Sequence, residues 1–569
     1  MGLRNFFNIK LLKNGVIVIL TGIVFGSLYN LFQNQKELSH NVSTYGIMKK
    51  HMAAGTLATN GALGPDSNVA IAHPSAPLQP WAFAQEKARD TVVQVISQTA
   101  EINILQPYKT PKQSMNAGSA FFIQPDGFQE GFLVTNAHVI EEAYAVWIKI
   151  PSLGRMIIDV EVVGKAPERD LALLRVSEDG LKKIKEKLGA IPYLTLGNSD
   201  QIRRTDEVLT LGYPLGQSSL KSTSGVVSGR EHMMGRLLIQ IDSPVNPGSS
   251  GGPALNINAE VIGMTAAGVQ SAQNVGYIIP INELKMILND LCKTALLRKP
   301  FLGFFLNSGS EELALHLNNP LPSGCYLIDV YNSSPLAKAG VKAGDMIYEI
   351  NGIAIDEYGD LALSWSEDKL SLMDYISMLE IGQKVDMVFY RNGTRKEVSL
   401  IFERTELAPI RQIFPGNEQL DYEIFGGMLI QPLNLNLVPV LVNNAPILTR
   451  YGVPRHQKEP ALIITHIVPN SQTQRLNILS EGTIIAEING KKVKSMEDLR
   501  YALAQGLEKE RITFKTEDGI FFVLNIQKVL NDEIKLSQAY QYPLSPFVKS
   551  LIEKGLKEKD TSVSDFTGI

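Results

Sequence analysis

Short β-type runs at regular spacing constrain the fold of this chain more than any other feature. Between residues 91 and 280, runs of β-branched and other apolar side chains alternate with turn residues such as Gly, Pro, Asn and Asp. Regularly spaced short strands with turn signals are typical of an antiparallel β-barrel or sandwich. Helical periodicity is expected only near 180–188 and at 281–291. The predicted strands are 91–96, 119–123, 131–137, 157–164, 171–176, 208–214, 237–241 and 261–267.

Composition excludes several classes of protein. Hydrophobic residues make up 44% of the 569 positions and charged residues 20%, which is ordinary for a globular protein and excludes a mostly disordered chain. The length allows about three or four domains. The formal net charge is -4, and no basic stripe is evident, so we expect no nucleic-acid partner.

The cysteine content is too low for a disulfide scaffold. The two cysteines, Cys292 and Cys325, form no CxxC pair, so a cysteine-ligated zinc site is not expected either. We interpret both as buried free thiols, because free cysteine behaves mainly as a small apolar side chain. A single bridge between them is the alternative.

The first 32 residues have the pattern of a membrane anchor. An uncharged run at 15–32 follows Arg4, Lys10 and Lys13. As a helix the run is about 27 Å long, close to the roughly 30 Å hydrocarbon core of a bilayer. The cations are expected on the cytoplasmic side, which places the rest of the chain in the periplasm or an organellar lumen. A cleaved signal peptide is the alternative, although no Ala-x-Ala site follows the run.

A linker is predicted to follow the anchor. Residues 33–85 lack sustained periodicity and are rich in Ala, Asn, Ser, Gly and Pro. Such a segment buries too little apolar surface to offset its ordering entropy. We therefore expect a flexible tether that holds the folded body away from the membrane.

Three motifs inside the β region carry the chemistry. T-N-A-H-V places His138 after a strand, R-D-L-A-L-L-R-V places Asp170 before one, and N-P-G-S-S-G-G-P-A-L places Ser250 in a glycine-rich turn. Alone, each has an ordinary structural interpretation as a packed histidine, a turn aspartate or a loop. Together, in one β domain, they predict a catalytic triad. The N–H groups of Gly248 and Ser250 are the predicted oxyanion hole.

The motifs resemble those of the HtrA/Deg family of trypsin-fold serine proteases. N-V-G-Y-I-I-P-I at 274–281 resembles the family's strand beside the primary specificity pocket. The resemblance implies a serine endopeptidase domain at 86–297, built from two six-stranded barrels with the active site between them, and needing no metal or other cofactor. Ser249 stands where the family most often has Asn, so Ser249 is an alternative nucleophile. The S-G-G-P spacing favours Ser250.

The same resemblance locates a specificity pocket. The implied border contains no acidic residue, so we expect small or medium aliphatic side chains before the cleaved bond. The implied border residues are Ala266, Ala267, Gly268, Gly276, Tyr277 and Ile278.

Residues 324–355 resemble a PDZ domain of the HtrA type. The matching pattern includes Ser334, Pro335 and the Gly344-Asp345 turn, in a predicted domain at 298–405. PDZ domains bind chain ends by strand addition, with backbone N–H groups holding the carboxylate. The binding loop implied by the resemblance is Phe301-Leu302-Gly303-Phe304; the alternative is that the glycine is only a turn residue.

A second, weaker PDZ-like copy is predicted at 406–530. Residues 461–503 repeat the strand–helix–turn–strand order, with Thr483 in place of the turn Asp. Residues 425–433 are the candidate binding strand, but a packing or assembly role is equally open. Residues 531–569 are predicted to be a C-terminal tail, polar and frayed near its end. The long PDZ intervals resemble the plant-type Deg branch.

The implied function is ATP-independent proteolysis of misfolded or damaged proteins, because the chain has no Gly-x-x-x-x-Gly-Lys loop. The resemblance further implies a trimer or trimer-based oligomer in which peptide binding to a PDZ domain regulates the protease. The alternative is a non-catalytic or dual-function chaperone, or a PDZ scaffold at the membrane.

Overall fold

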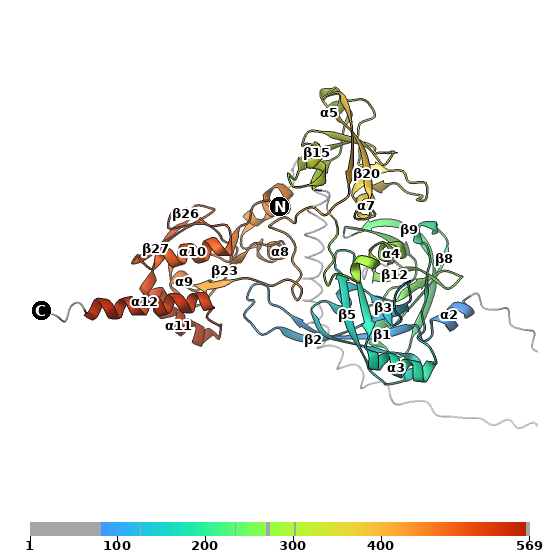
Figure 1. Ribbon diagram of the computed structural model, residues 1–569, viewed down its shortest axis with the longest axis horizontal. Coiled ribbons are helices and arrows are strands. Elements are labelled where there is room, and N and C mark those ends of the chain that lie inside the picture. The colour runs from blue at the N-terminus through green and yellow to red at the C-terminus, as the bar shows by residue number, and fades with distance from the viewer. Residues whose placement is uncertain (1–80, 126, 234, 269–273, 301–302, 565–569) are drawn as a thin grey trace, which may run out of the picture.

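The computed structural model describes residues 81–564, apart from 126, 234, 269–273 and 301–302. The predicted anchor at 15–32 and most of the predicted linker lie outside the described residues. Within the described part of the chain, no helix is both long and apolar enough to cross a bilayer. Three folded bodies follow one another along the chain (Figure 1).

The first body begins with a closed six-stranded barrel in the order β1-β2-β3-β6-β5-β4. Its inward-facing side chains, among them Val93, Phe122 and Leu174, are fully buried. The predicted strands in this region are confirmed, and β4, with only two buried side chains, is an addition to them. The strands are β1 (Val92–Glu101), β2 (Lys112–Ile123), β3 (Phe132–Thr135), β4 (Ala143–Lys149), β5 (Ile158–Ala166) and β6 (Leu171–Val176).

A second barrel follows in the order β11-β8-β9-β10-β13-β12 and closes through β11–β12 pairing, while β7 adds in parallel to β12. The two-barrel prediction is confirmed. The sequence does not predict β9, because most of its side chains are polar and only Val227 is buried. The strands are β7 (Thr195–Leu196), β8 (Glu207–Gly212), β9 (Lys221–Met233), β10 (Arg236–Ile241), β11 (Pro253–Leu255), β12 (Glu260–Gly268) and β13 (Gly276–Pro280).

Helices α2 (Ala82–Ala88), α3 (Glu178–Leu188) and α4 (Ile281–Leu291) pack on the barrels. The helices predicted near 180–188 and at 281–291 are confirmed. Helix α2 starts inside the segment predicted as linker, and it is ordered because Ala84 and Ala88 are fully buried in the core between the barrels. That core joins Phe121 of the first barrel to Tyr213 of the second, which holds the two barrels together.

The second body is a PDZ fold with sheet order β14-β15-β16-β20-β21, in which β14 is an edge strand. Both cysteines of the chain are free thiols, as predicted, and Cys325 lies fully buried in this body. The elements are β14 (Phe304–Asn307), α5 (Glu311–His316), β15 (Cys325–Val330), α6 (Pro335–Lys338), β16 (Met346–Ile350), β17 (Ile353–Ala354), β18 (Asp360–Leu361), β19 (Leu370–Ser371), α7 (Leu372–Ser377), β20 (Lys384–Arg391) and β21 (Thr394–Ile401).

The third body is a second PDZ fold with sheet order β22-β23-β24-β25-β27-β28. Here β22 pairs with the edge of β23, whereas β14 of the first PDZ fold has no such neighbour among the described strands. The elements are β22 (Glu423–Phe425), β23 (Met428–Pro432), α8 (Leu437–Leu441), β24 (Leu462–Ile467), α9 (Gln472–Leu476), β25 (Ile484–Ile488), β26 (Lys491–Lys492), α10 (Met496–Gly506), β27 (Arg511–Thr516) and β28 (Phe521–Asn525).

Much of the segment predicted as a C-terminal tail is helical. Helices α11 (Ile526–Tyr540) and α12 (Pro546–Ser564) pack against the second PDZ sheet. The reason is an apolar stripe at helical spacing, formed on α12 by Val548, Leu551 and Ile552, all of them buried. The prediction of a tail from residue 531 is therefore wrong for the part that these helices cover.

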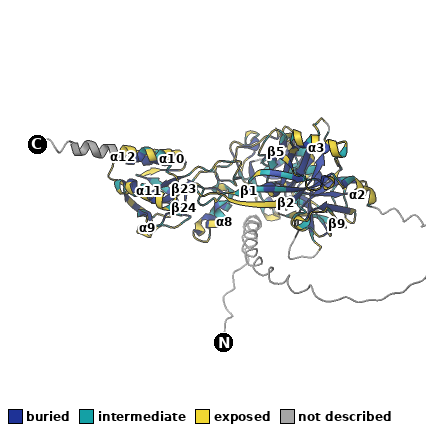
Figure 2. Cartoon of the chain, turned by 90° about the horizontal axis from the view of Figure 1, so that it is seen from below, coloured by how far each residue is buried: buried dark blue, intermediate teal, exposed yellow. Residues whose placement is uncertain are grey.

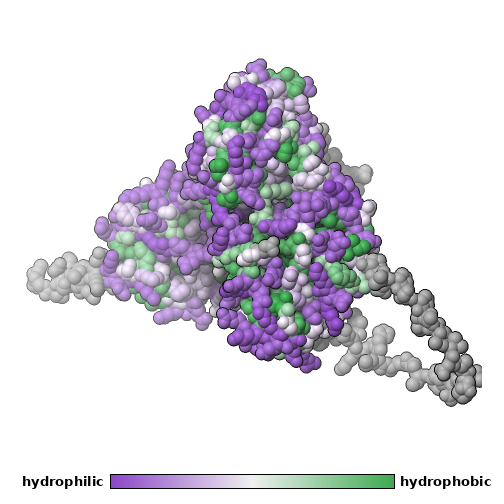
Figure 3. Space-filling view, turned by 45° about the vertical axis from the view of Figure 1, so that its right-hand side comes forward, coloured by the Kyte–Doolittle hydropathy of each residue, from purple (hydrophilic) through white to green (hydrophobic). Residues whose placement is uncertain are grey.

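The three bodies touch through polar contacts and through a few apolar side chains, such as Ile104 and Leu105, which pack on the third body. Buried residues concentrate inside each body (Figure 2), and the space-filling view shows three lobes with a largely hydrophilic surface (Figure 3). The loop between β1 and β2 reaches the second PDZ fold, where Gln431 Nε2 donates to the carbonyl of Ile104 over 2.9 Å. The first PDZ fold meets the protease body through Arg204 and Asp368, among other pairs.

Candidate active site

His138 and Asp170 form a preorganised pair. His138 lies in a short 3₁₀ turn (Ala137–Ile140) directly after β3. Its Nδ1 is 2.9 Å from Oδ1 and 3.0 Å from Oδ2 of Asp170, and its main-chain N–H donates to Oδ1 over 3.1 Å. The carboxylate therefore keeps a proton on Nδ1 and leaves Nε2 as an acceptor. The imidazole is 45% exposed, so a substrate can reach it.

Asp170 is held in an unusual conformation. It is buried at the start of β6 and has a φ of 57°, in the left-handed region that non-glycine residues rarely adopt. Asn136, next to the histidine motif, donates from Nδ2 to the main-chain oxygen of Asp170 over 3.0 Å. Backbone strain of this kind persists where the surroundings hold it, and it clusters at functional sites.

Arg236 is a site residue that the sequence does not reveal. It begins β10 and places Nη1 3.1 Å from Oδ2 of Asp170. Burial alone would raise the pKa of Asp170, but His138 and Arg236 outweigh it, and the pKa is lowered. Burial would likewise lower the pKa of His138. The contact with Asp170 outweighs burial, so the pKa of His138 is raised, although the positive charge of Arg236 opposes this rise. No motif surrounds Arg236, so only the fold could find it.

The turn that carries Ser250 is fastened to both barrels. From β2, Ser119 N–H donates to the main-chain oxygen of Ser250 over 2.8 Å, and Ser119 Oγ donates to that of Gly248 over 2.8 Å. From β12, Thr265 Oγ1 donates to the carbonyl of Ser249 over 2.5 Å. Ser119 also accepts from the N–H of Tyr213 over 2.9 Å. Ser119 and Thr265 are further supporting residues that no sequence motif indicates.

Two positions of the turn must be glycine, because a side chain there would collide with neighbouring main-chain atoms. At Gly248, with φ +93°, a methyl group would lie 2.5 Å from the carbonyl oxygen of Tyr213. At Gly251, with φ +86°, it would lie 2.1 Å from that of Ser119. Within the described part of the chain, the N–H groups of Gly248 and Ser250 have no protein acceptor. Both are thus available to an oxygen of a substrate.

The histidine and serine motifs meet at one glycine of β2. A methyl group at Gly118 would lie 2.6 Å from Cγ1 of Val139 and 3.3 Å from the main-chain oxygen of Ser250. Ser250 Oγ donates to the carbonyl of Ala266 over 3.2 Å, and among the described residues it makes no hydrogen bond to His138. A role for Ser250 as nucleophile would need its Oγ to turn from Ala266 toward Nε2, and hydrogen bonds between catalytic groups are often long or poorly aligned in substrate-free sites.

The predicted pocket border is formed by paired strands. Residues 266–268 of β12 lie beside 276–278 of β13, with Ala267 opposite Tyr277 and Gly268 opposite Gly276. Ile278 packs inside the second barrel, while Tyr277 joins the core between the barrels. Because successive strand residues face opposite sides, the side chain of Ile278 does not share the face of Tyr277. The prediction that Ile278 lines the pocket therefore holds at most for its main chain.

The predicted peptide-binding loop of the first PDZ fold is only partly described, because Phe301 and Leu302 lie outside the described residues. Gly303 has φ +77°, and its carbonyl accepts from the N–H of Tyr331 over 2.7 Å. The Phe304 side chain is 1% exposed in the core, so only its main chain faces a ligand.

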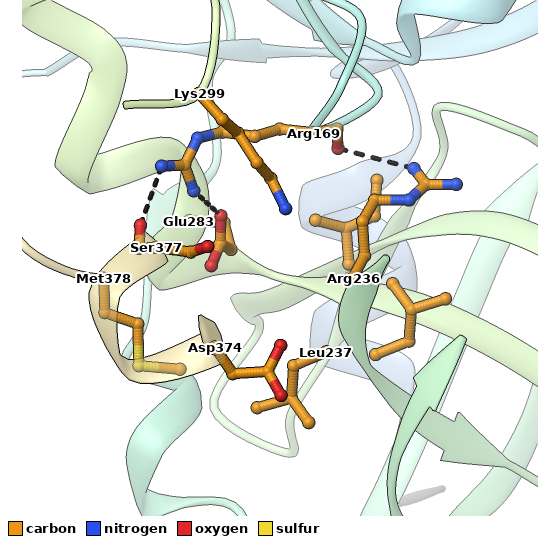
Figure 4. A pocket seen from close by; sticks show the side chains of 10 residues that line it. Arg169, Arg236, Leu237, Glu283, Lys299, Asp374, Ser377 and Met378 are labelled. Carbon is orange, nitrogen blue, oxygen red and sulfur yellow. Dashed lines mark hydrogen bonds and ion pairs between the residues drawn. The ribbon is translucent and has the colours of Figure 1, made fainter. Parts of the chain in front are cut away.

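A charged pocket connects the protease body to the first PDZ fold (Figure 4). Arg169, the neighbour of Asp170, pairs with Glu283 and donates from Nη2 to the carbonyl of Ser377 on α7 over 2.7 Å. Burial lowers the pKa of Lys299 in the same pocket. Helix α7 is therefore in direct contact with the residue that precedes Asp170.

Comparison with known proteins agrees with the division of the chain into one protease body and two PDZ folds. The chain matches the trypsin-like peptidase domain family over residues 118–264 and PDZ domain families over 300–401 and 414–545. The last match extends past the predicted boundary at 530 and takes in α11.

Two relatives of the chain are named as serine endoproteases. The chain is 26% identical to a probable periplasmic serine endoprotease DegP-like of Brucella suis over 68% of each chain. It is 27% identical to one of Rhizobium meliloti, over 71% of this chain and 74% of the relative. Among solved structures, an HtrA-type protease, AlgW with decapeptide, is 24% identical with a TM-score of 0.44, covering 57% of this chain and 99% of its own.

These matches define a trypsin-like serine endopeptidase followed by two PDZ domains. Within that class, the chain is similar to the DegP-like serine endoproteases, as the motifs around His138, Asp170 and Ser250 indicated. The resemblance seen in the sequence is thereby confirmed; the plant-type branch stays a prediction.

Proposed function

We propose that Ser250, His138 and Asp170 form the catalytic triad of this endopeptidase. His138 Nε2 takes the proton of Ser250 Oγ as Oγ attacks the scissile carbonyl, and then delivers that proton to the leaving amine. Asp170 keeps the imidazole in the required tautomer and stabilises the imidazolium. Water then attacks the acyl-enzyme with His138 again as base, which releases the product and regenerates the serine. The observation that carries this proposal is the two-oxygen contact between His138 and Asp170.

The N–H groups of Gly248 and Ser250 serve as the oxyanion hole in this proposal. A tetrahedral oxyanion forms during attack, and N–H groups aimed at it stabilise it more than they stabilise the flat carbonyl. Hydrogen bonds from Ser119 and Thr265 hold the turn in place, so these donors need not reorganise during the reaction.

Two alanine variants test the nucleophile. Ser250→Ala is expected to lose casein cleavage and covalent labelling by a fluorophosphonate, while Ser249→Ala keeps labelling. Labelling that survives in Ser250→Ala and disappears in Ser249→Ala would transfer the role to Ser249. Unchanged circular dichroism of both variants excludes loss of fold as the cause.

The proposed substrates are misfolded or damaged proteins that offer extended segments, cut after small or medium aliphatic residues. Support comes from the border at 266–268 and 276–278, which is small or apolar and holds no acidic side chain that would favour Lys or Arg. Profiling of a peptide library checks the preference, and a dominant preference for Lys or Arg would overturn it.

Regulation through the first PDZ domain is proposed on the contacts of α7. His232 of β9 lies 2.9 Å from Asp374, and Arg169 contacts Ser377, so a shift of α7 bears on the residues around Asp170. A peptide with an apolar free C-terminus is expected to change the cleavage rate of a short reporter, whereas its C-terminal amide is not. An equal rate with both peptides at saturation contradicts the proposal.

The proposed location is the periplasm, with residues 15–32 as a membrane anchor and a trimer-based assembly. Support for the compartment comes from the periplasmic relatives, and support for the anchor comes from the apolar run itself. Membrane fractionation of cells, with and without residues 1–32, tests the anchor. Mass photometry of the purified protein tests the oligomer.

A further inference from the structure

The turn between β22 and β23 is the counterpart of the binding loop of the first PDZ domain. Gly427 has φ +81°, a methyl group there would lie 2.1 Å from Cβ of Ser471, and its carbonyl accepts from the N–H of Val468 over 2.7 Å. Gly303 shows the same three features, with φ +77°, a 2.3 Å approach to Cβ of Ser334 and a 2.7 Å bond from Tyr331. Gly427 and Gly303 are therefore equivalent in backbone conformation and in the contacts that support them.

A buried carboxylate already occupies the turn of the second domain. Glu533 of α11 is 0% exposed, and its Oε2 accepts from the N–H of Gly426 over 3.0 Å. The N–H of Gly427 also stabilises this carboxylate. The other oxygen, Oε1, accepts from the hydroxyl of Tyr542 over 2.7 Å. Both oxygens thus meet the backbone and hydroxyl donors that a bound chain end would require.

An apolar side chain accompanies the carboxylate. Leu536 lies nearly one helical turn after Glu533, is 7% exposed, and packs with Ile424, Leu429 and Val468. The adjacent carboxylate, Asp532, is directed instead to Arg475 at 3.1 Å. Helix α11 therefore presents the combination that an apolar chain end offers, a carboxylate beside an aliphatic group.

In the second PDZ domain, the edge of the sheet where a peptide strand would add is already occupied by β22. β22 runs antiparallel to β23, with Phe425 opposite Met428, and its C-terminal end leads into the Gly426–Gly427 turn. An added peptide strand would have to pair with this edge of β23.

We propose that the Gly426–Gly427 turn is a carboxylate-binding site of the second PDZ domain and that Glu533 is its resident ligand. While α11 is docked, this domain takes no substrate chain end, and recognition of free C-termini is left to the first PDZ domain. The inference goes beyond the protease activity and does not depend on it, because every contact lies outside the catalytic body.

Amide hydrogen exchange in the full-length protein tests the site. In Glu533→Ala, exchange at Gly426 and Gly427 is expected to be about tenfold faster than in the native chain, because the buried hydrogen bonds from these N–H groups to the Glu533 side chain are lost. Sodium formate should restore protection by filling the vacated site, whereas sodium chloride at the same ionic strength should not. Glu553→Ala, which changes an exposed glutamate of α12, is the matched control and is expected to have no effect.

Three outcomes would overturn the proposal: unchanged exchange in Glu533→Ala, equal rescue by chloride, or two bound peptides per chain when a peptide with a free apolar C-terminus is titrated. One bound peptide agrees with an occupied second domain. No bound peptide also agrees with it, and counts instead against the proposed role of the first domain. If Glu533→Ala does not fold, Glu533→Gln keeps the side-chain shape, and partial loss of protection without formate rescue supports the site.

Discussion

At the residue scale, the triad is supported by side chains outside its three motifs. Arg236 pairs with the carboxylate of Asp170, Asn136 holds the main chain of Asp170, and Ser119 ties the serine turn to the first barrel. Each contact joins segments far apart in the chain. These residues do not react, but they position the groups that do.

Arg236 is expected to set the pH at which the enzyme becomes active. Its positive charge lowers the pKa of His138, so Arg236→Gln raises that pKa further above its ordinary value. The base must be neutral to accept a proton, and a higher pKa therefore moves the acidic limb of the kcat/KM profile to higher pH. The measurement is the pH dependence of kcat/KM on a short reporter peptide.

Arg175→Gln is the matched control for Arg236→Gln, because Arg175 forms an exposed pair with Glu161 on the surface of the same body. Its pH profile should coincide with that of the native protein. An acidic limb that stays in place in Arg236→Gln would show that the arginine has no influence on the base.

At the scale of elements, α11 joins the second PDZ sheet through a carboxylate in an apolar setting. Burial raises the pKa of Glu533 to about 7, although hydrogen bonds from Tyr542 and the glycine turn lower it. The aromatic ring of Tyr542 lies 5.8 Å from that of Tyr108, which belongs to the β1–β2 loop of the protease body. The helix therefore closes one domain, and the residues just after it border another.

The docking of α11 is expected to weaken as pH rises. With a folded pKa of about 7 and an ordinary value of 4.5, Glu533 holds a proton in the folded state that the unfolded chain releases. The unfolding free energy of α11 therefore falls between these two pH values, by on the order of 3 kcal/mol, and is then constant. Amide exchange along α11 measured across this range checks the slope. Glu533→Gln should remove it, and a slope that persists in that variant would contradict the assignment.

At the scale of the whole molecule, the first PDZ domain and the protease body meet through ion pairs. A hydrogen bond to the carboxylate of Asp374 raises the pKa of His232, and Arg204 pairs with Asp368 nearby. Such contacts are mostly polar, so the domain can shift without exposing a large apolar surface.

This contact is expected to loosen as pH rises. A histidine with a raised pKa contributes its full stabilisation below its ordinary value of 6.5 and loses it as pH rises through the folded value. Amide exchange in α7, corrected for the intrinsic rate, should increase across that range. Asp374→Asn should abolish the dependence, whereas Asp368→Asn, at a pair with the permanently charged Arg204, should weaken docking equally at every pH. Equal pH dependence in the native chain and Asp374→Asn would contradict the prediction.

The amino-acid sequence by itself predicted a trypsin-like peptidase domain followed by two PDZ domains, most strands of both barrels, and the three side chains proposed as the triad. Its signals are local: alternation along a strand, glycines where a turn leaves no room for a side chain, and short motifs around His138, Asp170 and Ser250. Only the tertiary structure decided that Arg236 faces the triad carboxylate, that Ile278 turns inward, and that the supposed tail supplies Glu533 to a PDZ turn. The physical reason is that these contacts join groups distant along the chain, and no local pattern records which of them folding brings together.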